Sequence, residues 1–373
     1  MSQNLSRRHF LRAAGLGVAS LASLRVGHAF AQGPRPDGTT YDFLDPTISF
    51  REVYGDYSMF GRVHGAARVR IFAAPDPKAN SLRTVYWGFT MPILESVRGP
   101  RYDSRAASPV WFRTHEGFVH SAYVVPCREQ FQQPLPSVDE PFWGEVSVPI
   151  SWQFQGPSLR SRRWDYAYYQ CFWGQVHKVL ERAEDEEGRV WYRLYDDIEP
   201  NRPAWVLAHH IRKLEPYEFE PISPDVTDKH IVISLPQQTL TAYEGDTMVF
   251  KTRIASGTSF EREDGVLINF QTLEGEYKVE SKRPSRRMRG GSDVGLPYDV
   301  NGVPWAIYFG DNGAAIHGAY WHNNYGTPRS HGCINITPDA AKWLYRWTAP
   351  YLSYDEELRH REPGELGTTI IVV

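Results

Sequence analysis

The chain has 373 residues, of which 41% are hydrophobic and 23% charged, and its formal net charge is −3. This composition is that of a globular protein with two or three domains, and the charge gives no support to a nucleic acid partner. The chain contains 12 Trp and 21 Tyr, and 27 Pro and 30 Gly interrupt it often. Such a mixture favours short strands and turns over long helices, so we expect a mainly β protein.

Residues 1–31 have the features of an export signal. A polar, basic segment with Arg7 and Arg8 precedes a short apolar run of small residues, and the stretch "AFA" ends at Ala31. The run is too short to span a membrane, and this order is typical of a secretory signal cleaved after Ala31, with an amphipathic first helix as the alternative. "SRRHFLR" also resembles the twin-arginine export motif, which implies export of a folded chain. We therefore expect a soluble mature protein in the periplasm or extracellular cell-wall space.

After a leader at residues 32–61, two segments alternate in short strands, at about 62–127 and 143–216. "PVWFRTHEGFVHSAYVVP" aligns with "RVWYRLYDDIEPNRPAWVLAHHIRKL", so that Trp111 matches Trp191. Both segments resemble the bacterial SH3-like module, a small barrel. The resemblance implies either contact with cell-wall glycan or a spacer role, and both remain open.

The three cysteines are an odd number. In an exported protein Cys127 and Cys171 could form a disulfide and leave Cys333 as the free thiol. A chain that folds before export meets reducing conditions first, so the sequence does not decide this pairing.

Residues 228–373 form a third predicted domain, which follows the Pro- and acid-rich linker "EPYEFEPISPDVTD". "KHIVISLPQQTLTAYEGDTMVFKTRIASG" predicts three strands with a hairpin turn at "EGD", and the apolar "GTTIIVV" predicts a strand at the centre of a sheet. One helix is expected from Pro338, with Thr337 as its N-cap and Asp339 in its first turn. We interpret the basic segment "ESKRPSRRMRGGSD" as a solvated loop, with contact to substrate carboxylates as the alternative.

"RSHGCIN" places Cys333 directly after His331 and Gly332. A second histidine, His317, ends the predicted strand "GAAIHGAYW", and the following loop can return to the cysteine. An imidazole within about 3–4 Å of sulfur would serve as a base for thiolate chemistry, and a glycine before the nucleophile lets backbone N–H groups converge as an oxyanion hole. A buried inert cysteine and a metal site that also uses His322 are the alternatives, but the spacing fits no common zinc pattern.

"IHGAYWHNNYGTPRSHGCIN" resembles the signature of the L,D-transpeptidase catalytic domain, the YkuD family: His-(Gly/Ser)-x(n)-Ser-His-Gly-Cys-x-Asn. "IVISLPQQTLTAYEGD" and "GVPWAIYFGDNGAAIHG" extend the resemblance over residues 228–373. "TLEGEYKV" lies where the family has Thr-Pro-x-Gly, and Leu273 and Glu274 depart from that pattern in a loop. The resemblance implies a β-rich domain with one or two helices.

The resemblance also implies the roles of the site residues. Cys333 would be the nucleophile and His317 the base, oriented by the carbonyl of Gly318. The backbone N–H groups of His331, Gly332 and Cys333 would form the oxyanion hole, while the turn would be shaped by three further residues: Ser330, Asn335 and Arg329. Possible substrate contacts are Trp321, Tyr308 and Arg329.

Members of this family cross-link peptidoglycan stem peptides. The implied reaction forms a thioester on Cys333, releases D-Ala from a tetrapeptide donor, and transfers the acyl group to an amine of an acceptor stem. No metal or organic cofactor is expected, and carbapenem-type inhibitors are expected to acylate Cys333. An L,D-carboxypeptidase or a wall-anchoring acyltransferase would use the same nucleophile, and a non-catalytic cell-wall-binding protein is the alternative from another class.

Overall fold

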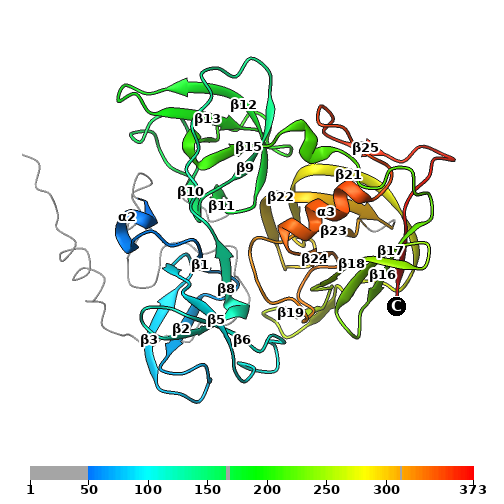
Figure 1. Ribbon diagram of the computed structural model, residues 1–373, viewed down its shortest axis with the longest axis horizontal. Helices are drawn as coiled ribbons and strands as arrows, with labels where there is room; N and C mark the ends of the chain where they lie inside the picture. Colours follow the sequence, from blue (N-terminus) through cyan, green and yellow to red (C-terminus); the bar gives the residue numbers. More distant parts are fainter. Residues whose placement is uncertain (1–48, 165–168, 311–312) are drawn as a thin grey trace, which may run out of the picture.

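The computed structural model describes residues 49–164, 169–310 and 313–373. The predicted export signal and residues 32–48 of the predicted leader lie outside this part of the chain. The described chain is mainly β, as predicted, and forms three groups of strands (Figure 1). One short helix, α2 (Phe50–Tyr54), precedes the first group. Within the described ranges, no helix is both long and apolar enough to cross a membrane.

The first β region contains two sheets, with strand orders β3-β2-β7-β6-β5 and β4-β1-β8. Its buried core is aliphatic and aromatic and is centred on Val63, Ile71, Phe112, Val119 and Val124. Its elements are β1 (Phe60–Val63), β2 (Arg68–Phe72), β3 (Ser81–Tyr86), β4 (Thr90–Pro92), β5 (Glu95–Arg98), β6 (Val110–Arg113), β7 (Phe118–His120), η2 (Ser121–Tyr123) and β8 (Val124–Cys127).

The second β region contains a five-stranded sheet of order β14-β13-β12-β9-β15 and the pair β10-β11. Its elements are β9 (Phe142–Val146), β10 (Ile150–Trp152), β11 (Gln170–Phe172), β12 (Val176–Glu184), β13 (Val190–Leu194), β14 (Trp205–Leu207), η4 (Ala208–His210) and β15 (Ile211–Lys213). A 3-10 turn, η5 (Pro216–Phe219), leads out of this region.

The two regions share a local order of elements. Trp111 in β6 and Trp191 in β13 are both fully buried. Each of these strands is followed by a partner strand, a 3-10 turn and a further strand, namely β7-η2-β8 and β14-η4-β15. The SH3-like interpretation of both regions stays a prediction. Cys127 and Cys171 are buried free thiols.

The third β region is built on a nine-stranded sheet in which β18-β17-β16-β26-β21-β22-β23-β24 are neighbours and β25 pairs with β21. The predicted central position of "GTTIIVV" is confirmed, because β26 lies between β16 and β21. The strands are β16 (Lys229–Ser234), β17 (Thr239–Glu244), β18 (Thr247–Arg253), β19 (Ser259–Glu261), β20 (Leu267–Asn269), β21 (Gly275–Gly290), β22 (Tyr298–Phe309), β23 (Ala315–Gly318), β24 (Ile334–Ile336), β25 (Arg359–His360) and β26 (Thr369–Val372).

Helix α3 (Pro338–Trp347) covers one face of this sheet (Figure 1). Its predicted start is confirmed: the side chain of Thr337 accepts a hydrogen bond from the backbone N–H of Ala340 at 3.3 Å, and Pro338 is the first helical residue. Its buried face joins one core with three isoleucines of β23 and β24: Ile316, Ile334 and Ile336. Burying each isoleucine side chain stabilises the fold by about 1.5–3 kcal/mol. This packing therefore determines which face of β23 and β24 is turned towards α3.

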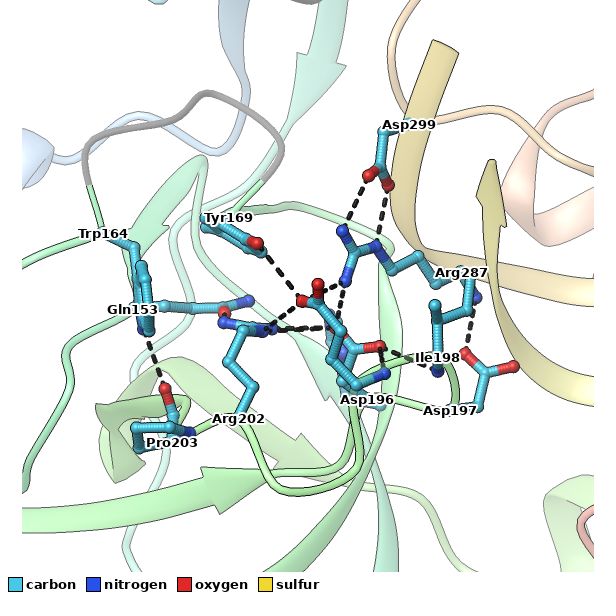
Figure 2. Close-up of polar contacts among 12 residues, drawn as sticks. Gln153, Trp164, Tyr169, Asp196, Asp197, Ile198, Arg202, Pro203, Arg287 and Asp299 are labelled. Carbon is cyan, nitrogen blue, oxygen red and sulfur yellow. Dashed lines mark hydrogen bonds and ion pairs between the residues drawn. The ribbon is translucent and has the colours of Figure 1, made fainter. Parts of the chain in front are cut away.

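The interpretation of "ESKRPSRRMRGGSD" as a solvated loop is wrong. Residues 280–290 of this segment lie in the long strand β21, and the side chain of Arg287 is only 2% exposed. Arg287 forms ion pairs with Asp196 and Glu199 of the second region and with Asp299 of β22, at 2.8, 2.8 and 2.7 Å (Figure 2). The sequence pattern suggested a solvated segment because two of these carboxylates, Asp196 and Glu199, lie 91 and 88 positions from Arg287 along the chain.

Candidate active site

Strands β23 and β24 bring the predicted base and nucleophile together. They pair in parallel, with Ile316 opposite Ile334 and His317 opposite Asn335. Cys333 directly precedes β24. Successive side chains of a strand point to opposite faces, and the isoleucines point into the core beneath α3. His317 and Cys333 therefore lie on the other face of the sheet, as diagonal neighbours on adjacent strands.

The proton on the His317 ring is fixed by a backbone contact. Nδ1 lies 3.2 Å from the carbonyl oxygen of Gly318. A carbonyl oxygen only accepts, so Nδ1 carries the hydrogen and Nε2 keeps its lone pair. Burial lowers the pKa of His317 to about 4, against a smaller raising effect of the Gly318 carbonyl. The imidazole is therefore neutral at neutral pH and able to accept a proton.

The Cys333 thiol is half-buried, and burial raises its pKa to about 11, with a lowering contribution from the backbone of Ala315. The resting pair is thus a neutral thiol and a neutral imidazole. Among the described residues, no hydrogen bond joins Sγ of Cys333 to the His317 ring. Hydrogen bonds between such groups are often long in unliganded enzymes and shorten when substrate binds.

The turn that carries Cys333 is held from both ends. Ser330 Oγ donates to the carbonyl of Cys333 and accepts the N–H of Gly332 at 3.2 Å. Gly332 has φ +110°, a conformation that favours glycine, so no other residue suits this place. Thr272 Oγ1 donates to the carbonyl of Gly332 at 2.9 Å and accepts the N–H of Gly257 at 2.9 Å. One predicted oxyanion donor, the N–H of Gly332, is consequently already engaged by Ser330.

The side chain of His331 packs in an aromatic box rather than facing the thiol as a second base. Its ring stacks on Phe260 at a centroid distance of 4.3 Å, and Phe270 and Tyr298 lie at 4.7 and 4.8 Å. Burial lowers the pKa of His331 to about 4. The histidine therefore anchors the turn through stacking with the β19–β20 hairpin, and it could contribute to an oxyanion hole only through its backbone.

The three predicted substrate contacts occupy different places. The ring of Trp321 lies 5.6 Å from that of His317. Tyr308 lies near the thiol: burial raises its pKa to about 12, and Cys333 contributes to this rise. Arg329 instead extends towards the first β region, where it donates to the carbonyl of Gly65 at 3.5 Å. Trp321 and Tyr308 are thus close to His317 and Cys333, respectively, and Arg329 is at an interface between regions.

Three residues near the site were not found from the sequence. Thr272 supports the turn, Tyr298 lies beside both His331 and Cys333, and His322 is buried with Nε2 3.0 Å from the side-chain amide of Asn335. Thr272 begins "TLEGEYKV", so a signal for it was available. His322 was considered only as a metal ligand, and nothing in the local pattern indicated Tyr298.

In residues 49–164, 169–310 and 313–373, no three His, Cys, Asp or Glu side chains are grouped so that they could hold a metal ion.

Residues 228–372 match the family model of the L,D-transpeptidase catalytic domain, YkuD. No curated protein matches the chain. Similar solved structures include an L,D-transpeptidase from Stackebrandtia nassauensis, with 22% identity, coverage of 39% of this chain and 55% of that chain, and a TM-score of 0.26. Another is residues 123–326 of the L,D-transpeptidase from Xylanimonas cellulosilytica, with 22% identity, coverage of 42% and 65%, and a TM-score of 0.28.

A third similar structure is the catalytic domain of an Enterococcus faecium L,D-transpeptidase acylated by ertapenem, with 25% identity, coverage of 39% of this chain and 97% of that chain, and a TM-score of 0.28. The chain spans less than two thirds of the first two proteins. The likeness of residues 228–372 to the L,D-transpeptidase catalytic domain therefore rests on the family-model match.

Proposed function

We propose that this protein is a peptidoglycan L,D-transpeptidase, which cross-links stem peptides through a thioester on Cys333. The observation that carries the proposal is the placement of His317 and Cys333 on one face of β23 and β24, with the Nδ1 proton of His317 directed to Gly318. The family match over residues 228–372 supports the same chemistry. Export to the cell-wall space belongs to the proposal, because that is where peptidoglycan lies.

In the acylation half of the reaction, Nε2 of His317 accepts the thiol proton as Sγ attacks the carbonyl carbon that precedes the terminal D-Ala of a tetrapeptide stem. The C=O electron pair moves to oxygen and forms an oxyanion. When this intermediate collapses, the C–N bond to D-Ala breaks, and the imidazolium returns the proton to the leaving amine. The product is a thioester between Cys333 and the third stem residue.

In the second half, an acceptor amine attacks the thioester carbon and loses a proton to His317. The C–S bond breaks, the thiolate takes up that proton, and a new amide joins two stems. At neutral pH the His317 ring is unprotonated and has a free site for a proton, and its protonated form is a strong acid towards the leaving group.

The developing oxyanion requires backbone donors near Sγ, and the N–H groups of His331, Gly332 and Cys333 surround that position in sequence. Because the N–H of Gly332 donates to Ser330 in the unliganded site, the substrate oxygen competes with a hydroxyl for this donor. We infer that Ser330 releases Gly332 when the intermediate forms.

An L,D-carboxypeptidase would use the same acyl-enzyme and differ only in that water resolves it, and a wall-anchoring acyltransferase would use a different amine. The decisive experiment incubates the protein with a disaccharide tetrapeptide and analyses the products by mass spectrometry. A cross-linked dimer with free D-Ala supports transpeptidation, whereas a tripeptide without dimer assigns the carboxypeptidase reaction instead.

Cys333→Ala is the matched variant for this experiment, and Cys171→Ala is its control because that thiol is buried away from the site. We expect the first substitution to abolish both products and the second to leave them unchanged. A carbapenem should add its mass to the wild type and not to Cys333→Ala. Full turnover by Cys333→Ala would show that the proposed nucleophile is wrong.

A further inference from the structure

The segment that joins the base to the nucleophile is held from outside the third β region. This connecting loop, residues 319–329, runs between β23 and the turn of Cys333. In addition to Arg329, two asparagines tie it to the first region: Asn323 Nδ2 donates to the carbonyls of Ser121 and Val124 at 3.1 and 3.3 Å, and Asn324 Nδ2 donates to that of Arg105 at 2.6 Å. The part of the loop nearest to His317 is held by Arg62 of β1 and by His64, which directly follows that strand.

Arg62 of β1 is completely buried. Its Nη2 donates to the carbonyl of Tyr320 at 2.8 Å, and its Nη1 donates to the carbonyl of Pro149 in the second region at 3.1 Å. The guanidinium also lies over the ring of Phe172, 4.0 Å from its centroid. One side chain therefore joins all three β regions at a point three residues after His317.

His64 directly follows β1, two residues after Arg62, and in an extended chain two such side chains point to the same face. Its Nδ1 donates to the carbonyl of Trp321. Burial, followed by the nearby charge of Arg62, holds the pKa of His64 well below its ordinary value, so the ring is neutral. Arg62 and His64 thus hold two consecutive carbonyls of the connecting loop.

These two carbonyls control the position of an aromatic side chain next to the base. The Trp321 ring lies 5.6 Å from the His317 ring at an interplanar angle of 33°, and Tyr320 is fixed by a hydrogen bond from its hydroxyl to the carbonyl of Asn301 at 2.6 Å. His317 is 2% exposed in this arrangement. A shift of the Trp321 backbone would move the indole away from His317 and admit water.

We propose that Arg62 and His64 are positioning residues of the reaction, which fix Trp321 against His317 and so keep the base buried and oriented. The first β region is then part of the active-site machinery and not only a spacer or a wall-binding module. As far as it concerns cross-linking, this inference rests on the proposed function. The reactivity of the Cys333 thiol tests it independently of any peptidoglycan substrate.

The chemistry of Arg62 argues against a purely stabilising role. No carboxylate accepts a hydrogen bond or forms an ion pair with its guanidinium among the described residues, its Nε has no partner, and burial lowers its pKa to about 10. A buried cation of this kind has a large desolvation cost, and apolar residues of similar volume often fold as well or better. What an apolar side chain could not do is donate to two carbonyls at once.

The surroundings of His317 make the proposal measurable. The groups that face it are the Gly318 carbonyl and the Trp321 ring on its own chain segment, His322 further along the loop, and Cys333 on the adjacent strand. None of these is a carboxylate that would raise the pKa of His317. If the loop loosens, the ring becomes more exposed, and its pKa rises towards the ordinary value of 6.5.

The test compares Arg62→Met and His64→Phe with the wild type. Because small displacements of catalytic groups reduce rates by up to about 100-fold, we expect kcat to fall at least ~10-fold with little change in KM. The acid limb of the pH profile of kcat/KM should move to higher pH. The acid limb of the pH profile of Cys333 alkylation by iodoacetamide should move in the same direction. Arg62→Lys, which retains a donor, should recover part of the rate. Arg212→Met is the control, because Arg212 pairs with Glu145 and Glu218 away from the loop.

Folded variants that keep the wild-type kcat and the wild-type acid limb would overturn the proposal. If Arg62→Met does not fold, His64→Phe and Arg62→Lys give the same comparison. A wild type that forms no product from tetrapeptide would refute the proposed function alone, because the pH dependence of Cys333 alkylation still distinguishes a positioned base from an unpositioned one. A fall in melting temperature without a shift of the acid limb would identify a structural role only.

Discussion

The first β region contacts the connecting loop through hydrogen bonds that end on backbone carbonyls, whereas the second region meets the β21–β22 hairpin through charges on both sides. Arg62 and His64 donate to Tyr320 and Trp321 without any carboxylate in the contact. In the second interface, Arg287 lies between Asp299 and Asp196 (Figure 2), and it also forms an ion pair with Glu199.

The two kinds of contact therefore have different roles: one attaches the second region, and the other positions the connecting loop. A charged network is costly to bury, but it strongly penalises the loss of any one member, so it fixes how the second region is attached. Hydrogen bonds to carbonyls depend on the exact backbone position and so control the local geometry of the loop beside His317. Stability and positioning are therefore expected to respond to different substitutions.

The largest effect on stability is expected from Arg287→Met. The substitution leaves Asp196, whose side chain is 1% exposed, with Arg202 as its one guanidinium partner within the described ranges. We expect the free energy of unfolding to fall by about 3 kcal/mol, measured by urea denaturation. Arg286→Met is the control, since Arg286 is 32% exposed and contacts Asp197, and its effect should be below about 1 kcal/mol. Equal effects would show that burial does not distinguish the two arginines.

Gly318→Ala should combine the two kinds of effect within the third region. A Cβ at this position would lie 2.8 Å from Pro304 Cγ and 2.9 Å from the backbone Cα of Pro338, so the start of α3 would have to move. We expect a loss of about 1–3 kcal/mol in unfolding free energy together with a lower kcat, because the carbonyl that orients His317 shifts. Calorimetry and turnover assays on the same sample check both. Wild-type behaviour in both would mean that the strand adapts without displacing the base.

The contributions of the two interfaces to the free energy of unfolding should also be lost in different pH ranges. The pKa of His64 is lowered in the folded state, so its contribution is present above the unfolded value of 6.5 and is lost as pH falls below it. Burial raises the pKa of Asp196, but the N–H of Glu199 and the charge of Arg287 outweigh this and leave it lowered, so its contribution persists until pH falls below 3.8. Limited proteolysis at pH 5 should therefore cut residues 319–329 before the β21–β22 hairpin; the reverse order would contradict these assignments.

The smallest effect is expected at an exposed pair between the same two parts of the chain as Arg287. Lys178 pairs with Glu357, whose side chain is 44% exposed. Lys178→Met should change the unfolding free energy by less than about 1 kcal/mol. A loss as large as that of Arg287→Met would mean that attachment of the second region does not depend on the buried network.

The features that could be predicted from the sequence are those encoded within a few residues of each other. The cap of α3 at Thr337, the central strand at the end of the chain and the Ser330–Cys333 turn each have a local signature. The same holds for His317, because a strand end followed by a flexible loop indicated that it could return to Cys333.

The rest depends on contacts between distant segments. Arg62 and the carbonyl of Tyr320 are 258 positions apart, and Arg287 and Asp196 are 91 positions apart. Nothing in a basic segment of β21 indicates which carboxylates will lie opposite. The misassigned loop and the missed role of β1 have this common cause: alternation predicts strands, but it does not predict which side chains meet across regions.

The central place of β26 has a consequence for how the third region folds. Its partners are β16, about 140 positions earlier along the chain, and β21, and it pairs with both. Until β26 inserts, β16 and β21 each present an unpaired edge, and closing a loop of this length is slow. The sheet must therefore be completed from its middle, and its two halves are open to mispairing with other chains during that interval. Co-expressed chaperones or a lower growth temperature should raise the yield of native protein more than any change at the surface of the finished fold.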